Sequence, residues 1–494
     1  MADGVVDRLV ALFEPRGVIV AGASPHPGRF GTVVLHNVLT SGSDAGGYAG
    51  PVFATSREGG EVLGVETVVS VDDLPDGCAE LVVICTPHAV NVELLAACGR
   101  KGVKAAFVAA AGYGEAGEEG RRDETELIAA AEAAGILLAG PNGQGLVSTP
   151  VSLCAQMVAP YPPAGSIAIA SQSGNLTSGF MNFSVQTGVG ISRAVSVGNG
   201  PVLSVLDYLE YFAADPASNV SLAYMEGVPD GRRFIERARG VTSRQPLVVL
   251  KGGASAEGQR AATSHTGSMA TDDAVFDAAC RQAGIARAAS MEEAFETAAT
   301  FATQPLPAGP NVAVVTTVGG VGVLTADAIA GTDLNLVRLA DDLVSQIDEL
   351  LPPRWSKNNP VDTAAGETRD TVPDLLALLA GHESVDSIIF LGIGIQSNQG
   401  GMMEVGRFYP EHGLERIASF HRRQDARYAE VAVGISESSG KPILVASELA
   451  VSQPDNPGVR AVRESGRLCY PSASRAARAL HHTWGYAQYL RERG

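Results

Sequence analysis

The sequence predicts an α/β protein built from doubly wound, mostly parallel sheets. Short apolar runs alternate along the chain with stretches that have the apolar spacing of helices, and glycine-rich turns follow several of the runs. Apolar residues make up 45% of the 494 residues and charged residues only 18%, which indicates a large, well-buried protein. Strands separated by single helices are typical of parallel sheets covered on both faces. A chain of this length has room for about three domains.

Residues 1–150 form the first expected domain. The strands expected in it are 17–22, 51–54, 81–85 and 105–109, and the helices are 32–39, 89–99 and 127–134. The loop Ala23–Gly31 follows the first strand, where doubly wound sheets bind ligands. Its glycines let backbone N–H groups approach a phosphate, and the next helix directs its positive end there. The loop lacks the GxGxxG fingerprint of dinucleotide sites, so a tight turn without a ligand stays an open alternative.

Residues 151–305 repeat the alternation and form the second expected domain. A proline-rich link at 160–163 precedes a strand at 166–170. Directly after this strand, Ser171-Gln-Ser-Gly-Asn-Leu-Thr177 opens a helix. Two hydroxyls, a glycine and an asparagine at a helix start offer caps and free backbone donors. The segment is therefore either a good helix cap or an anion site.

Two further strands of this domain lead to a candidate catalytic pair. The strand 221–225 ends at Glu226, and the strand 246–250 leads through Lys251-Gly-Gly to a loop that carries His265. A histidine in such a loop can be a base, a metal ligand or a nucleophile, and metal binding is disfavoured because no second ligand stands at suitable spacing. Glu226, at the same sheet edge, can orient the imidazole. The alternatives are a hydrogen-bonded structural histidine and a solvated glutamate.

Residues 311–494 form the third expected domain. After a linker at 303–310, the strand 311–316 and the turn Thr317-Val-Gly-Gly restate the strand, turn and helix of the second domain. Later strands are expected at 387–393 and 442–445. The polar stretch 396–440 has clustered arginines and glutamates, and we interpret it as an exposed helical insertion.

Composition excludes several classes of partner. The net charge is −18 and lysines and arginines form no long run, which argues against nucleic acid and anionic membranes. The six cysteines form no CxxC pair, as in a reduced cytoplasmic protein. We find no export signal and no run of about 18 apolar residues, so no membrane span is expected.

The order of the motifs resembles the NDP-forming acyl-CoA synthetases, relatives of the succinyl-CoA synthetase α chain. The matching motifs are Gly22-Ala-Ser24 with Gly28 and Gly31, Gly140-Pro-Asn142, Ser171-Gln-Ser-Gly174, Gly198-Asn199, Glu226-Gly227, Lys251-Gly-Gly253 and Ser264-His-Thr-Gly267. The resemblance covers nearly the whole chain. Its most specific part is Ser-His-Thr-Gly after Lys-Gly-Gly.

The resemblance implies a Rossmann-like CoA-binding domain followed by two flavodoxin-like domains. It implies an acid–thiol ligase that reversibly converts a carboxylate, CoA and an NTP to acyl-CoA, NDP and phosphate, through acyl phosphate and phosphohistidine. By resemblance His265 carries the phosphoryl group and Glu226 orients it. The residues implied in phosphate binding are Ser171, Ser173, Gly174 and Asn175, and those implied in CoA binding are Gly22, Ser24, Gly28, Arg29, Gly31, Arg57, Pro87 and Asn142.

The family's nucleotide-handling ATP-grasp domain finds no room in the chain. The resemblance therefore implies a separate ATP-grasp β-type subunit that supplies ATP or GTP and Mg²⁺, and a homo- or hetero-oligomer. The chain departs from the family at Gly143-Gln144, where Cys-Leu is usual, at Gly200-Pro201, where an acidic turn is shortened, and at Thr317-Val318, where Asn-Ala is usual. The carboxylic acid and the choice between ADP and GDP stay open.

Two other functions agree less well with the sequence. A non-catalytic sensor or scaffold that binds CoA or acyl-CoA would have little reason to keep His265, Glu226 and the helix-start serines together. A dehydrogenase is disfavoured because GxGxxG is missing and Thr55-Ser56-Arg57 stand where a ribose-binding carboxylate is expected.

Overall fold

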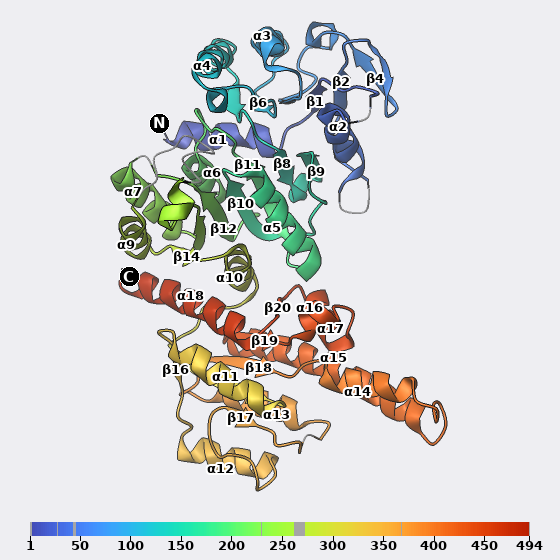
Figure 1. Cartoon of the computed structure of the whole chain (residues 1–494), viewed down its shortest axis with the longest axis vertical. Helices are drawn as coiled ribbons and strands as arrows, with labels where there is room; N and C mark the ends of the chain where they lie inside the picture. Colours follow the sequence, from blue (N-terminus) through green and yellow to red (C-terminus); the bar gives the residue numbers. More distant parts are fainter. Residues whose placement is uncertain are drawn as a thin grey trace. The chain divides into compact units, whose positions relative to one another are not determined.

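The computed structural model describes residues 2–26, 28–42, 46–228, 230–260, 272–366 and 368–493. The chain divides into two compact units, one of residues 1–186 and 190–294 and the other of residues 187–189 and 295–494. The first unit contains two seven-stranded sheets and the second unit one six-stranded sheet (Figure 1).

The first sheet has the strand order β3-β4-β2-β1-β5-β6-β7 and is parallel except for the pair β3–β4. Its strands are β1 (Val18–Ala21), β2 (Val52–Thr55), β3 (Gly60–Val62), β4 (Val65–Val68), β5 (Leu81–Ile84), β6 (Ala105–Val108) and β7 (Leu137–Ala139). The helices of this region are α1 (Ala2–Phe13), α2 (Phe30–Thr40), α3 (Asn91–Arg100) and α4 (Glu118–Ala133). The doubly wound arrangement predicted from the sequence is confirmed, and the hairpin β3–β4 is an addition to it.

Both faces of this sheet are buried. Val18 and Val20 of β1 belong to a core that includes residues of α1 and α2, whereas Ile19 and Ala21 belong to a core with residues of α3 and α4. Successive side chains of a strand point to opposite faces, so a strand covered on both sides is apolar throughout. This is why β1 appears in the sequence as an unbroken apolar run.

The second sheet has the order β14-β13-β12-β10-β11-β8-β9. Its strands are β8 (Gly145–Ser148), β9 (Leu153–Gln156), β10 (Ala164–Ser171), β11 (Ile191–Ser196), β12 (Val220–Met225), β13 (Leu247–Lys251) and β14 (Ala286–Ala288). Helices α5 (Gly174–Thr187), α6 (Val205–Phe212), α7 (Gly231–Thr242) and α9 (Asp273–Ala283) accompany them. Strands β10 to β14 pair in parallel, and β8 and β9 add an antiparallel edge beside β11.

Helix α1 packs against helix α6 of the second sheet. The ring of Phe13 stacks on Tyr211 with centroids 5.2 Å apart. Behind it, the fully buried guanidinium of Arg193 on β11 forms an ion pair with Asp215 at 3.0 Å and reaches Glu14 directly after α1. The two sheets of the first unit are therefore joined by a buried aromatic and ionic contact.

The sheet of the second unit has the order β16-β15-β18-β19-β20, with β17 also paired to β15. Its strands are β15 (Asn311–Thr316), β16 (Asn335–Leu336), β17 (Val361–Asp362), β18 (Ser387–Leu391), β19 (Ile443–Ala446) and β20 (Cys469–Tyr470). The helices are α10 (Met291–Thr303), which leads in from the first unit, α11 (Gly319–Ala330), α12 (Asp341–Leu350), α13 (Thr371–Gly381), α14 (Ile395–Glu404), α15 (Leu414–Ser439), α16 (Leu449–Ser452), α17 (Pro457–Glu464) and α18 (Ala473–Arg491). All described pairs are parallel, as the sequence predicts for a relative of the second domain.

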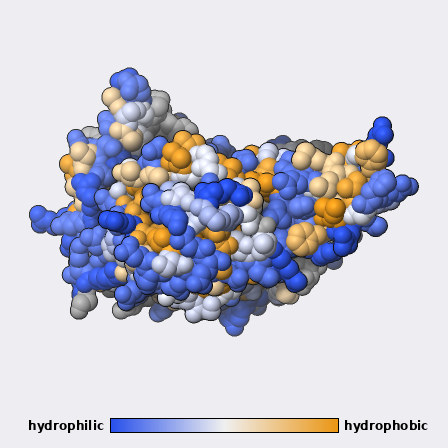
Figure 2. All heavy atoms as spheres, turned by 90° about the horizontal axis from the view of Figure 1, so that it is seen from below, coloured by the Kyte–Doolittle hydropathy of each residue, from blue (hydrophilic) through white to orange (hydrophobic). Residues whose placement is uncertain are grey.

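The stretch 396–440 forms α14 and α15 with a turn between them, but it is not wholly exposed. Tyr428, Ala429 and Ala432 of α15 are buried in the core of the second unit with Phe390 of β18. The interpretation as an exposed insertion is wrong for this half of α15, because its few apolar residues recur at helical spacing among polar ones. Figure 2 shows apolar groups gathered toward the tip of the hairpin α14–α15 on a mostly hydrophilic face.

None of the helices in the described part of the chain combines the length and the apolar character that a membrane span requires.

Candidate active site

The candidate site lies at the carboxyl edge of the second sheet. Strand β10 has β11 on one side and β12 on the other, so its successive connections leave in opposite directions. Doubly wound sheets bind ligands in the crevice at such a point. The loops that meet here are Ser171–Ser173, after β10, and Glu226-Gly227, after β12.

The loop after β10 is a closed turn that starts helix α5. The fully buried hydroxyl of Ser171 donates to the carbonyl of Ser173 over 2.7 Å and accepts from the Ser173 amide over 3.2 Å. The amide of Leu176 donates to the Ser173 hydroxyl over 3.5 Å. In this geometry Ser171 shapes the turn, and the amides of the first turn of α5 are the donors best placed for an anion.

Glu226 is a buried carboxylate beside that turn, with 8% of its surface exposed. Its backbone N–H donates to the side-chain oxygen of Gln172 over 2.6 Å, and the Tyr224 hydroxyl donates to its carboxylate over 3.4 Å. Burial and the charge of Glu226 raise the pKa of Tyr224 to about 12, so this donor stays protonated near neutral pH. The structure thus brings the backbone of Glu226 to Gln172, just before the start of α5.

Lys251 is the last residue of β13, at the same edge of the sheet, and its side chain binds the backbone of the loop that follows. Its buried ammonium group donates to the carbonyls of Gly252 and Gly253 over 3.3 and 3.2 Å and lies 3.5 Å from the carboxylate of Asp273. His265, the expected nucleophile, lies outside the described residues.

The expected CoA cradle lies at the corresponding point of the first sheet, between β1 and β5. Gly22 has a left-handed φ of +92°, and a Cβ there would lie 3.1 Å from the amide nitrogen of Thr86. A Cβ on Gly31 would lie 2.2 Å from the carbonyl oxygen of Gly22. The first turn of α2 therefore lies directly against the loop after β1.

The remaining expected CoA residues surround this loop. The amide of Ser24 donates to the Thr32 hydroxyl over 3.2 Å. The other members are exposed, with Arg29 just before α2, Arg57 just after β2 and Pro87 two residues after Cys85. The last two of the expected set are Gly28, which has a left-handed φ of +78°, and Asn142, which has one of +61°.

Sequence reasoning missed two carboxylates near the Gly140-Pro-Asn142 loop. The amide of Asn199 donates to the carbonyl of Pro141 over 2.9 Å, and its side chain donates to Glu115 over 2.6 Å and to Glu124 over 2.8 Å. Burial of Glu115 raises its pKa, but hydrogen bonds from Asn199 and from the backbone outweigh this and lower it. Both glutamates belong to an acidic stretch that has the pattern of a solvated helix face, so no sequence signal distinguished them.

Gln144, noted in the sequence as a departure, covers the start of α5. Its side chain donates to the side-chain oxygen of Asn175 over 2.9 Å and accepts from the Ser178 hydroxyl over 3.3 Å. A Cβ on Gly174 would lie 2.4 Å from the side-chain carbonyl carbon of Gln144. The side chain of Asn175, an expected phosphate ligand, is thus held by Gln144.

Comparison with known proteins agrees with this arrangement. Sequence profiles match for the CoA binding domain over residues 16–148, for the succinyl-CoA ligase like flavodoxin domain over 164–301 and for the ligase-CoA domain over 312–392. The chain is 32% identical over 487 residues to the subunit alpha of acetate–CoA ligase (ADP-forming) I of Pyrococcus furiosus, covering 97% of this chain and 98% of that one. The chain belongs to the ADP-forming acetate–CoA ligase family.

Further relatives extend this family assignment. The subunit alpha of the II form from the same organism is 38% identical over 377 residues, which cover 76% of this chain and 80% of that one. A solved structure of the dinucleotide-forming acetyl-coenzyme A synthetase 1 of Ca. Korarchaeum cryptofilum, in complex with phosphate and ADP, superposes with a TM-score of 0.81 at 29% identity, covering 98% of each chain. The prediction of an acid–thiol ligase of the NDP-forming acyl-CoA synthetase type is confirmed, as is the fold class.

Within the described ranges, no group of three or more histidine, cysteine, aspartate or glutamate side chains has the geometry of a metal site.

Proposed function

We propose that this chain is the α-type subunit of a ligase that reversibly converts a small carboxylic acid, CoA and an NTP to acyl-CoA, NDP and phosphate. The observation that carries the proposal is that Glu226 is buried and that its backbone N–H donates to the side-chain oxygen of Gln172, just before α5. A buried negative charge next to an anion-binding turn suits a site where a histidine becomes charged by carrying a phosphoryl group.

The proposed first step exchanges CoA for phosphate. Inorganic phosphate attacks the thioester carbonyl of acyl-CoA, the carbon–sulfur bond breaks, and acyl phosphate and CoA are formed. Amides of the first turn of α5, with Ser173, Gly174 and Asn175, bind the phosphate, and Ser171 shapes that turn. CoA is held by Gly22, Ser24, Gly28, Arg29, Gly31, Arg57, Pro87 and Asn142. The approach of α2 to the loop after β1 supports this second assignment.

In the proposed second step, an imidazole nitrogen of His265 attacks the phosphorus of acyl phosphate. The bond between phosphorus and the acyl oxygen breaks, so the carboxylic acid leaves as carboxylate and His265 keeps the phosphoryl group. Glu226 accepts a hydrogen bond from the other ring nitrogen and stabilises its positive charge. Tyr224 is protonated near neutral pH, and its hydroxyl donates a hydrogen bond to the Glu226 carboxylate and so helps to orient it.

In the proposed last step the phosphoryl group passes to ADP or GDP on a partner ATP-grasp subunit, which also binds Mg²⁺. The names of two Pyrococcus relatives as alpha subunits support a partner chain. We further propose three domains, 1–150, 151–305 and 311–494, and a cytoplasmic location. All six cysteines are free thiols, as suits a reducing compartment.

The test is phosphorylation of the purified chain by an acyl phosphate, followed by alkaline digestion and mass spectrometry. We expect an acid-labile phosphate on His265 that is absent from His265→Ala and forms more slowly in Glu226→Gln. His26→Ala, which alters an exposed histidine of another loop, is the matched control and should be phosphorylated like the parent chain. An unmodified parent chain that still binds CoA would overturn the proposal in favour of a non-catalytic CoA-binding protein.

A further inference from the structure

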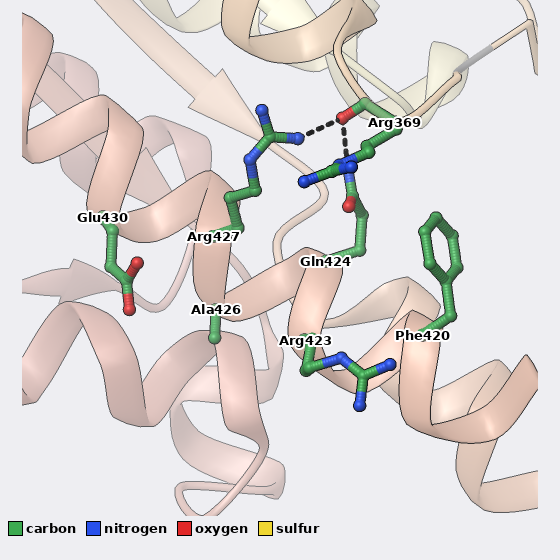
Figure 3. Close-up of a pocket in the computed structure, with 7 residues that line it drawn as sticks. All are labelled: Arg369, Phe420, Arg423, Gln424, Ala426, Arg427 and Glu430. Atoms are coloured by element: carbon green, nitrogen blue, oxygen red, sulfur yellow. Dashed lines mark hydrogen bonds between the residues drawn. The ribbon is translucent and has the colours of Figure 1, made fainter. Parts of the chain in front are cut away.

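A basic groove lies on the second unit, on residues that the proposed ligase chemistry does not use. It has a volume of about 570 Å³. Side chains from α15 and from the segment before α13 line it. Among them are Arg369, Phe420, Arg423, Gln424, Arg427 and Glu430 (Figure 3). Small-molecule sites have volumes of roughly 300–1,000 Å³, so the groove has the size of one.

Hydrogen bonds hold the two walls of this groove together. Figure 3 shows Gln424 and Arg427 reaching from α15 to the backbone carbonyl of Arg369, and the bond from Arg427 is 2.7 Å long. Arg427 also forms an ion pair with Asp370. Gln424 is 3% exposed, so it anchors the floor of the groove. Arg427 therefore stabilises the contact between α15 and the segment before α13. These bonds hold the groove in this conformation without a ligand.

The guanidinium groups of Arg369 and Arg423 do not take part in these contacts. Within the ranges that the structure describes, the guanidinium groups of Arg369 and Arg423 donate to no protein acceptor, and both residues are exposed. The lining carries three guanidinium groups and one carboxylate, Glu430, and Asp370 pairs with Arg427 beside it, which leaves a local charge of +1 on a chain whose net charge is −18. Like charges in one groove repel each other, and a bound anion that accepts from several guanidinium groups relieves this repulsion.

An aromatic ring stands beside these charges. Phe420 is 42% exposed and precedes Arg423 by three residues and Arg427 by seven on α15. Residues at this spacing share one helix face, so the ring and the two guanidinium groups border the groove together. Arginine matches the geometry of phosphate groups, and an aromatic face stacks on a flat base.

We propose that this groove binds a nucleotide through its phosphate groups and its base. The phosphates pair with Arg369, Arg423 and Arg427, and the base stacks on Phe420. Free nucleoside diphosphate and CoA share this chemistry, since CoA carries an adenine nucleotide with phosphates. The site shares no residue with the candidate active site in the first unit.

The test is calorimetric titration of the purified whole chain with ADP, carried out in the His265→Ala background so that no phosphoryl transfer contributes. We expect one ADP per chain, and binding that weakens by about tenfold or more in Arg369→Gln/Arg423→Gln. The matched control Arg460→Gln/Arg493→Gln removes the same charge from two exposed arginines outside the groove and should keep the parent affinity. Phe420→Leu should weaken ADP binding and leave pyrophosphate binding unchanged.

Titration with CoA separates the two sources. One CoA per chain in both double variants, with ADP binding retained at saturating CoA, identifies free nucleotide as the ligand. If the chain binds a second equivalent of CoA, and this equivalent is lost in Arg369→Gln/Arg423→Gln but not in the control, CoA is the ligand of the groove.

Three results overturn the proposal. They are no ADP binding, equal ADP affinity in the two double variants, and pyrophosphate binding as tight as ADP together with no effect of Phe420→Leu. None of these results depends on whether His265 is phosphorylated.

Discussion

The backbone N–H of Glu226 donates a 2.6 Å hydrogen bond to the side-chain oxygen of Gln172. The backbone N–H of Gln172 in turn donates to the backbone carbonyl of Tyr224 over 3.2 Å. These bonds join the loop after β12 to the loop after β10, although Gln172 and Glu226 are 54 residues apart. The backbone of Glu226 is thereby held beside Gln172, two residues before the start of α5.

Gln172→Ala should slow phosphorylation of the chain by acyl phosphate. The variant leaves the Glu226 amide without its acceptor, and an unpaired buried amide costs about 1–3 kcal/mol, so the loop should shift and the rate fall by about tenfold. The measurement is the rate of acid-labile phosphate formation. CoA affinity should stay unchanged, because the expected CoA cradle lies on the first sheet. Gln346→Ala, which removes an exposed bond within α12, is the control. Equal rates in the two variants would contradict the role given to Gln172.

Gly31→Ala should weaken CoA binding. A Cβ at this position would lie 2.2 Å from the carbonyl oxygen of Gly22, so α2 must move away from the loop after β1. Overpacking of this kind costs about 1–3 kcal/mol, which corresponds to about a tenfold weaker Kd if the loop carries the cost. Calorimetric titration with CoA measures it. Gly4→Ala, where nothing lies within 4 Å of the added Cβ, should bind CoA like the parent chain. An unchanged Kd in Gly31→Ala would show that CoA does not use this loop.

Arg193→Ala should strongly destabilise the first unit. The fully buried guanidinium pairs with the carboxylate of Asp215, whose side chain is 4% exposed. Removing one partner of a buried pair leaves the other charge uncompensated, at a cost of about 3–5 kcal/mol. Differential scanning calorimetry should show a lower melting temperature. Arg193→Met/Asp215→Asn should recover part of the loss, because no buried unpaired charge remains at Asp215 and the other partner of Arg193, Glu14, is partly exposed to water.

The control for this prediction is Arg100→Ala, which breaks an exposed ion pair with Asp72. Exposed pairs contribute little, so its melting temperature should stay close to that of the parent chain. A loss as large as that of Arg193→Ala would indicate that burial is not the reason for the effect.

Because of Glu80, the free energy of unfolding of the first unit should depend on pH in the acidic range. Burial raises the pKa of this carboxyl, but hydrogen bonds from Arg16 and Lys104 outweigh burial and lower the pKa from 4.5 to about 2. A carboxyl with a depressed pKa in the folded state stabilises the fold above its unfolded pKa, and this contribution is lost as the pH falls from about 4.5 to about 2.

Melting temperatures of the parent chain and of Glu80→Gln between pH 2 and pH 7 measure this contribution. The variant should melt lower at pH 7, and the difference from the parent chain should shrink toward pH 2. Glu66→Gln changes an exposed carboxyl on β4 and should follow the parent curve. A difference between Glu80→Gln and the parent that stays constant with pH would contradict the prediction.

Much of the fold could be predicted because its strands are buried on both faces. Residues 18–21 and 167–170 are fully buried, and each belongs to a continuous apolar run in the sequence. The order of strands and helices then determines a parallel sheet, and the sheet edge where ligands bind follows from that order. This is why Glu226 and Ser171–Gly174 could be assigned to one site before their positions were known.

The hairpin β3–β4 and the buried face of α15 could not be predicted in the same way. Strand β3 is short and largely exposed, so it leaves little apolar signal. In α15, Tyr428 and Ala432 are buried among arginines and glutamates that give the stretch a polar average. Burial of such residues depends on packing against β18, which is remote in the sequence.

The sequence by itself determined the α/β class, the order of the ligase motifs and the edges of the sheets that carry them, because these depend on local burial and on chain order. Only the tertiary structure decided which polar side chains meet there. Asn199 reaches Glu115 across 84 residues, and Gln144 reaches Asn175 across 31. Hydrogen bonds of this kind need a distance near 3 Å and a defined direction, and residues acquire both only when the packed elements hold their backbones in place.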